Sequence, residues 1–157
     1  MTNLKQLLQR PLRVLPNSLV IIFLIVALLG FADAAYLTIE HYQNVIPPCS
    51  VTGGCEVVLT SAYSTVYGIP VSLLGAIYYI LVCIGAFAYL EGKNEKLFKA
   101  SIVLVFLGFI ASLWFFFIQA AVLHSYCLYC LGSALSTTIL FILSCIVLTK
   151  YKDESNI

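Results

Sequence analysis

The sequence predicts an all-α integral membrane protein: a four-transmembrane-helix bundle with a long extracytoplasmic loop between the first and second helices. Of the 157 residues, 62% are hydrophobic and 10% are charged, and the mean hydropathy is +1.03. A soluble domain carries about 25% charged residues. This composition, with a net charge of only +1, excludes a soluble domain, a disordered chain and a nucleic-acid binder.

Four apolar stretches are each long enough to cross a hydrocarbon core, which takes about 20 helical residues. They run over residues 18–38, 71–90, 100–123 and 128–149. Short polar turns join the last three stretches, so these spans are antiparallel. The one long connection, loop 39–70, is expected to carry function because of its length. We therefore expect a cytoplasmic N-terminus (1–17), a membrane domain (18–149) and a cytoplasmic tail (150–157).

The cations set the orientation in the membrane. In a four-span topology every Lys and Arg lies on one face, and these residues are Lys5, Arg10, Arg13, Lys93, Lys96, Lys99, Lys150 and Lys152. The positive-inside rule makes that face cytoplasmic. Both termini are then cytoplasmic in a plasma (inner) membrane, and loop 39–70 and the turn before residue 128 are extracytoplasmic.

Two segments allow a second interpretation. Ala32-Asp-Ala34 resembles a signal-peptide cleavage site, but the apolar run continues past it, and we expect an uncleaved anchor. In the loop, Val58, Ala62 and Val66 recur at helical spacing. This spacing predicts a short helix behind Cys55, with irregular coil as the alternative.

Four of the six cysteines are extracytoplasmic in this topology. Cys49 and Cys55 lie in the loop, and Cys127 and Cys130 form a C-x-x-C motif where the third turn enters the fourth helix. The other two lie within spans and are interpreted as inert packing residues: Cys83 and Cys145. The four outer cysteines could form two structural disulfides in an oxidising compartment.

The C-x-x-C motif favours redox chemistry over that structural role. A cysteine at a helix N-terminus lies near unsatisfied backbone N–H groups, which stabilise its thiolate. A disulfide within four residues constrains the unfolded chain very little. The motif also lies at the boundary between water and lipid, where a lipid-soluble electron carrier can meet a thiol carried by the loop.

Two further residues are candidates near this site. Asp33 lies within the first span, where a carboxylate is costly and normally faces the bundle interior. We expect it to form a hydrogen bond near the electron acceptor or its covering loop, as a proton relay or an orienting group, or else to make a polar contact without redox effect. His124 could stabilise a thiolate or be an imidazole satisfied by water.

These features resemble the vitamin K epoxide reductase family, in the prokaryotic branch that makes disulfides. The resemblance rests on the loop cysteine pair, Ser61 after it, Gly68-Ile-Pro70-Val-Ser72-Leu-Leu-Gly75 entering the second span and the C-x-x-C motif opening the fourth. It implies a bundle that encloses a quinone of the ubiquinone or menaquinone class beside Cys127 and Cys130. Activity on vitamin K epoxide is not implied.

The resemblance also implies a role for each site residue. Cys130 would pass electrons to the quinone, Cys127 would be attacked by Cys49, and Cys55 would form the mixed disulfide with an extracytoplasmic thioredoxin-like protein. Ser61 would lie near the quinone or its adjacent cysteine. Many bacterial relatives carry a fused thioredoxin-like domain, which this sequence lacks, so the partner is expected to be a separate protein.

We therefore expect an enzyme, a quinone-dependent thiol oxidoreductase that generates disulfides by reoxidising that partner. Two other classes of function remain open. Paired cysteines could bind or transport a thiophilic metal ion, although these pairs face an oxidising compartment and we expect no metal site. A structural tetraspan protein with a loop disulfide is the third class, but it leaves Cys127 and Cys130 unexplained.

Overall fold

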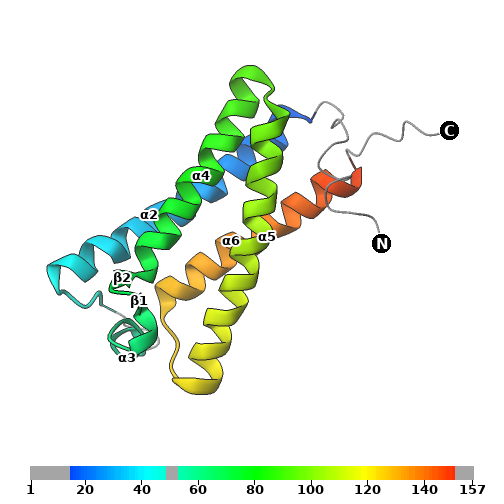
Figure 1. Ribbon diagram of the computed structural model, residues 1–157. Helices are drawn as coiled ribbons and strands as arrows, with labels where there is room; N and C mark the ends of the chain where they lie inside the picture. Colours follow the sequence, from blue (N-terminus) through cyan, green and yellow to red (C-terminus); the bar gives the residue numbers. More distant parts are fainter. Residues whose placement is uncertain (1–14, 49–52, 151–157) are drawn as a thin grey trace.

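The computed structural model describes residues 15–48 and 53–150. Within these ranges four helices are long and apolar enough to cross a membrane (Figure 1): α2 (Asn17–Gln43), α4 (Val71–Gly92), α5 (Glu95–Phe117) continued by the π-helix η2 (Ile118–Val122), and α6 (Leu128–Lys150). Helices α2 and α5 each pack against both α4 and α6. The predicted four-helix membrane bundle is therefore confirmed.

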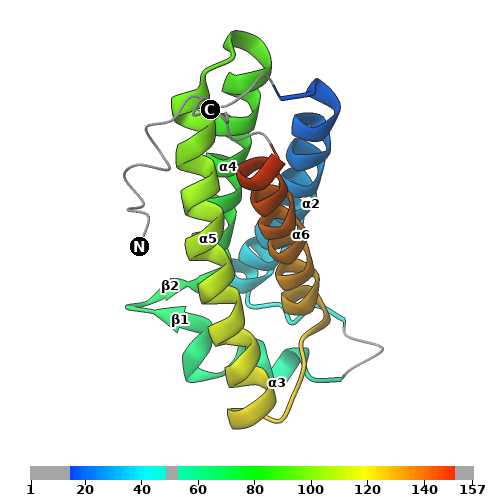
Figure 2. The same ribbon diagram turned by 90° about the vertical axis from the view of Figure 1, so that its right-hand side faces the viewer.

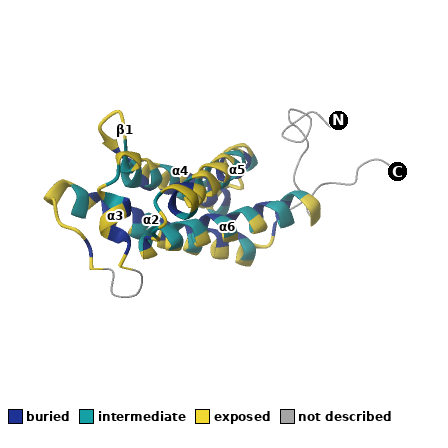
Figure 3. Cartoon of the chain, turned by 90° about the horizontal axis from the view of Figure 1, so that it is seen from below, coloured by how far each residue is buried: buried dark blue, intermediate teal, exposed yellow. Residues whose placement is uncertain are grey.

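The bundle has a core of small and aromatic side chains. Phe23 of α2 and Phe98 of α5 meet edge to face with ring centroids 5.4 Å apart, and both are fully buried. Figure 3 shows buried residues along the inward faces of the helices and exposed residues along the outward faces. Many outward side chains are large and apolar, such as Ile84, Ile110 and Trp114. An apolar outer surface of this kind suits contact with lipid.

The first span is longer than the apolar pattern predicted. Helix α2 continues past Thr38 to Gln43, because its end is set by a backbone cap and not by the loss of apolar residues. Asn44 adopts the left-handed conformation with φ of 56°, and its N–H bonds to the carbonyls of Glu40 and His41. The last turn of α2 therefore extends beyond the apolar stretch, and the loop that follows is shorter than expected.

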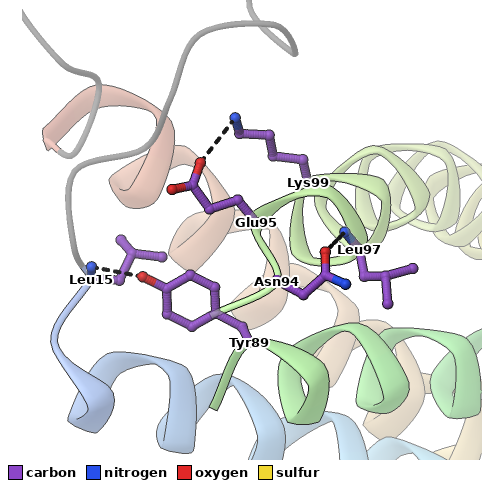
Figure 4. Close-up of polar contacts among 6 residues, drawn as sticks. All are labelled: Leu15, Tyr89, Asn94, Glu95, Leu97 and Lys99. Carbon is purple, nitrogen blue, oxygen red and sulfur yellow. Dashed lines mark hydrogen bonds and ion pairs between the residues drawn. The ribbon is translucent and has the colours of Figure 1, made fainter. Parts of the chain in front are cut away.

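The turn between α4 and α5 is held by polar contacts (Figure 4). The Asn94 side chain caps α5 by accepting a hydrogen bond from Leu97 N–H at 3.3 Å. Lys99 and Glu95 form an ion pair at 3.5 Å. The hydroxyl of Tyr89 accepts a hydrogen bond from the Leu15 N–H at 3.0 Å and ties the start of the described chain to α4.

The opposite end of the bundle, called the loop end below, carries the connection between α2 and α4 (Figure 2). It contains α3 (Cys55–Leu59), the 3-10 helix η1 (Ala62–Ser64) and an antiparallel hairpin of β1 (Thr65–Val66) and β2 (Ile69–Pro70). The short helix predicted behind Cys55 is present but ends at Leu59. The hydroxyls of Thr60 and Ser61 donate to the carbonyls of Glu56 and Val58, and such local bonds compete with helix continuation.

Candidate active site

Cys127 caps the N-terminus of α6. Its carbonyl accepts the hydrogen bond of the Leu131 N–H at 3.0 Å, which makes Cys127 the residue just before the first helical turn. Its sulfur interacts with the backbone N–H groups of Tyr129 and Cys130. Side chains at the N-cap position normally accept from these same two groups. The C-x-x-C motif therefore opens the last helix as predicted, with the Cys127 sulfur in place of the usual oxygen.

The surroundings of Cys127 favour its thiolate. The Cys130 thiol donates a hydrogen bond to the Cys127 sulfur and lowers the pKa of Cys127 to about 7. The backbone N–H groups of Cys130 and Tyr129 act in the same direction, whereas burial and the negative charge of Asp33 oppose it. A large share of Cys127 is therefore ionised at neutral pH, in the form that attacks disulfides.

The loop places Cys55 directly against Cys127. Their Sγ atoms lie 3.4 Å apart, and both residues are 0% exposed. Cys55 is itself disulfide-bonded. A thiol in contact with a disulfide sulfur has the arrangement that thiol–disulfide exchange requires. The resemblance assigned the contact with Cys127 to Cys49, which lies outside the described residues; among the described residues, Cys55 makes this contact.

Gly54 allows the loop to come this close. A Cβ atom at Gly54 would lie 2.6 Å from the carbonyl oxygen and 2.8 Å from the nitrogen of Tyr126. No side chain fits in that space, so only glycine lets this backbone lie against the segment that precedes Cys127. The sequence gives no sign of this role for Gly54, because nothing local shows which backbone it faces.

A cavity of about 1010 Å³ lies between the helices and the loop, next to Cys130 of the C-x-x-C motif. Most of its lining surface is apolar, but polar side chains such as Glu40, Asn44 and Thr137 also line it. Cys130 lines it, whereas Cys127 and Cys55 do not. The two cysteines of the motif thus have different neighbours, with Cys127 in contact with the loop cysteine and Cys130 at the cavity.

Asp33 and Ser61, the two other candidate site residues, both line this cavity. One carboxyl oxygen of Asp33, Oδ2, is buried and has no hydrogen-bond partner among the described residues. The other, Oδ1, faces α6 beside Gly132, where a Cβ atom would lie 3.9 Å away. The hydroxyl of Ser61 donates to the Val58 carbonyl at 2.7 Å. Asp33 therefore brings an unpaired buried acceptor to the same space as Cys130.

Tyr79 of α4 is hydrogen-bonded to residues that follow Cys130 in α6. Its hydroxyl donates to the Ser133 carbonyl at 2.8 Å and lies 2.9 Å from the hydroxyl of Thr137. Its ring fills a notch at Gly30, where a side chain would clash with it. Close contact at small residues is common between membrane helices. These contacts fix α2, α4 and α6 around the cavity.

Gln119 is a site residue that the sequence analysis missed. It lies in η2, is only 4% exposed, and its side-chain oxygen accepts a hydrogen bond from the Cys127 N–H at 2.9 Å. The available signal was a lone amide near the end of an apolar span, eight residues before Cys127. Sequence spacing alone could not show that the amide turns back onto the cysteine.

The remaining candidates lie apart from the C-x-x-C motif. Cys145 follows Cys130 by about 20 Å along α6, and neither it nor Cys83 lines the cavity. Both carry free thiols. His124 is exposed and occupies the left-handed conformation, with φ of 48°, in the turn before α6. An exposed imidazole agrees with the alternative in which water satisfies it.

Comparison with known proteins gives one family. The model described as the vitamin K epoxide reductase family matches residues 21–145. The match begins in α2, includes the whole loop and the C-x-x-C motif, and ends in α6. A search of the curated proteins finds no match.

Proposed function

Because the chain belongs to the vitamin K epoxide reductase family, a family of membrane oxidoreductases, we propose that it is a quinone-reducing thiol oxidoreductase that generates disulfides. One observation carries the proposal. The Cys127 sulfur lies 3.4 Å from that of Cys55, while Cys130 of the same motif lines the cavity. The motif can therefore link a loop disulfide to a ligand held among the helices.

In the proposed relay, a thioredoxin-like partner reduces the loop cysteine pair. The Cys55 thiolate then attacks Cys127 of a Cys127–Cys130 disulfide, forming a Cys55–Cys127 bond and releasing the Cys130 thiolate. Attack by Cys49 on Cys55 restores the loop disulfide and releases the Cys127 thiolate. Two electrons have then moved from the loop to the C-x-x-C pair. This scheme gives Cys55 the contact with Cys127 and leaves Cys49 for the partner, the reverse of the roles expected from the resemblance.

The cavity suits a quinone of the ubiquinone or menaquinone class. Its volume, about 1010 Å³, and the mostly apolar surface of its lining suit an organic cofactor. As a carboxylic acid, Asp33, whose Oδ2 has no partner among the described residues, would donate a hydrogen bond to a quinone carbonyl. The hydroxyl of Ser61 lines the same space but donates to the Val58 carbonyl, so it would contact the ring without being its main donor. Bound beside Cys130, a quinone would supply a lipid-soluble acceptor for the two electrons of the C-x-x-C pair, and it would take up two protons as it is reduced.

The proposed location follows from the same scheme. The thioredoxin-like partner must reach the loop end, which we place outside the plasma (inner) membrane. The four lysines of the described chain lie toward the other end of the bundle, in the α4–α5 turn, the start of α5 and the end of α6: Lys93, Lys96, Lys99 and Lys150. The positive-inside rule supports a cytoplasmic position for that end.

Reconstitution tests the function. Purified protein in lipid, supplied with a quinone and a reduced thioredoxin-like protein, should oxidise the protein and reduce the quinone. Cys55→Ala should stop oxidation of the protein, while dithiothreitol, which can reach the C-x-x-C pair directly, still drives quinone reduction. Cys130→Ala should stop both, and Cys83→Ala is the matched control with both activities intact. Full activity of Cys130→Ala would contradict the proposal.

Binding of a thiophilic metal ion has less support as an alternative. Within residues 15–48 and 53–150, no group of three or more His, Cys, Asp and Glu side chains is placed to hold an ion. Thiol trapping distinguishes the two functions. The redox state of a relay changes with quinone supply, whereas cysteines that hold a metal ion become reactive when a chelator removes it.

A further inference from the structure

The turn that carries Cys127 is tied to the preceding helix by Gln119. The backbone carbonyl of Gln119 accepts a hydrogen bond from the Ser125 N–H at 3.1 Å. Its side-chain oxygen, Oε1, accepts one from the Cys127 N–H at 2.9 Å. One residue thus fixes two points of the reversal between α5 and α6, and the second point is the reactive cysteine itself.

The side chain of Gln119 is placed for this contact by an irregular segment of helix. It lies in η2, where the Leu123 N–H bonds to the Ile118 carbonyl five residues back. Such wide turns are rare in proteins overall, and many of those that occur lie at functional sites. Gln119 is almost fully buried, and burying an amide is costly unless it is hydrogen-bonded. The Cys127 N–H supplies a partner for its oxygen.

Helix α6 needs this acceptor because its own sequence lacks one. In a capping box, the side chain three residues after the N-cap reaches back and accepts the N-cap N–H. That position in α6 is Cys130, whose thiol is engaged with the Cys127 sulfur. The amide of Gln119, from a different element, accepts the N–H instead.

We propose that Gln119 is a positioning residue that holds Cys127 at the N-cap of α6, so that its sulfur points at once to the helix N-terminus and to Cys55. The hydrogen bond at the Cys127 nitrogen fixes the peptide plane before the residue and thereby the direction of its side chain. Without the bond, the sulfur moves away from the N–H groups of Tyr129 and Cys130 and from the Cys55 sulfur. The part of this inference that concerns exchange with Cys55 rests on the proposed function.

Replacing Gln119 changes geometry without changing charge. The titratable groups around the Cys127 sulfur are Asp33 of α2, Cys55 of α3, and Tyr129 and Cys130 of α6. Gln119 adds none, and methionine fills nearly the same volume with no strong acceptor. A shift in the ionisation of Cys127 in Gln119→Met therefore reports the position of its sulfur.

The test measures alkylation of Cys127 in the reduced full-length protein. Iodoacetamide is applied over a series of pH values, and peptide mass spectrometry follows Cys127 separately from the other cysteines. In the unchanged chain the midpoint should lie below about 8.5, the ordinary cysteine value. In Gln119→Met it should rise toward that value. A midpoint in folded Gln119→Met equal to that of the unchanged chain overturns the inference.

Further variants separate positioning from stability. Ser144→Ala removes a buried polar atom of α6 that has no partner among the described residues, and it should leave the midpoint unchanged. If Gln119→Met does not fold, Gln119→Asn withdraws the same oxygen by one methylene and should raise the midpoint likewise. An unchanged midpoint in folded Gln119→Asn would then count against the inference.

A cross-link provides the second readout. With Cys49 and Cys130 replaced by Ser, mild oxidation should join Cys55 to Cys127, and Gln119→Met should lower the yield about tenfold. Gln119→Glu keeps an acceptor oxygen and should restore the yield, whereas equal loss in both variants would contradict the proposed role. Neither readout needs a quinone, so failure of the proposed function can be told apart from failure of this inference.

Discussion

Among single residues, Cys127 should show the clearest dependence on pH. Its pKa is lowered to about 7, chiefly by the Cys130 thiol, so its thiolate persists at neutral pH and is lost as the pH falls through that value. Cys130→Ala removes the donor and should raise the alkylation midpoint of Cys127 toward about 8.5. Cys130→Ser keeps a hydroxyl donor and should give a smaller rise. Equal midpoints in the unchanged chain and Cys130→Ala would exclude Cys130 as the main cause.

Asp33 is the second residue whose role can be resolved by substitution. Its Oδ2 is buried and lacks a partner among the described residues, and it lines the cavity with Cys130. We expect Asp33→Leu to slow quinone reduction, by about a hundredfold if the carboxyl transfers protons. A proton relay requires Asp33→Asn to be slow as well, whereas an orienting hydrogen bond requires only Asp33→Leu to be slow. Normal turnover in both variants would remove Asp33 from the site.

The sequence singled out the residues of the proposed relay by their type, but not the residues that contact them. Cysteines in a C-x-x-C motif and a carboxylate within a span are recognisable by type, because few other functions explain them. Gln119 and Gly54 act through contacts with Cys127 and Tyr126 that are distant in the chain. Such contacts exist only after the turn and the loop have folded, so local pattern could not reveal them.

At the scale of elements, the approach of α3 to α6 depends on Gly54. Gly54→Ala places a methyl group against the Tyr126 backbone and should push α3 away from Cys127. We expect Cys55–Cys127 exchange to slow about a hundredfold, since a displacement of 1 Å can cost that much. The helices of the bundle do not depend on this contact, so circular dichroism should be unchanged.

Gly53→Ala is the matched control for this prediction. Gly53 has open space where a Cβ would lie, with nothing within 4 Å, and its φ is +60°. Alanine there adds backbone strain of about 1 kcal/mol without any clash. Exchange should therefore be less affected in Gly53→Ala than in Gly54→Ala, and equal rates in the two variants would show that the close approach is not required.

The helices also show where a hydrophobic pattern stops being informative. Apolar runs located all four spans, but they misplaced the end of α2, which a left-handed Asn44 determines. They also gave no sign of η2, because an α-helix and a π-helix can share the same apolar composition. The pattern behind Cys55 predicted α3 but extended it into β1, since Val66 fits a helical spacing and a strand equally well.

At the scale of the whole molecule, the two ends of the bundle differ in their chemistry. The loop end holds Cys55, Cys127 and the loop residues that line the cavity, and loop 39–70 has no Lys or Arg. The opposite end has Lys93 in the α4–α5 turn and Lys150 at the last residue of α6. The positive-inside rule fixes topology from an excess of Lys and Arg on one side of the membrane.

This asymmetry predicts the orientation of every span. Reporter domains fused after Gly54 and after Ser125 should be active only outside the membrane, and one fused after Asn94 only inside. A variant with fewer positive charges provides the control. Replacing Lys93, Lys96 and Lys99 by Gln should weaken the preference of Asn94 for the cytoplasmic side without altering the length of any span, because the positive-inside rule acts through Lys and Arg. An external Asn94 in the unchanged chain would place the C-x-x-C motif in the cytoplasm. A reducing compartment would then keep both cysteine pairs as thiols, and disulfide formation by this protein would be excluded.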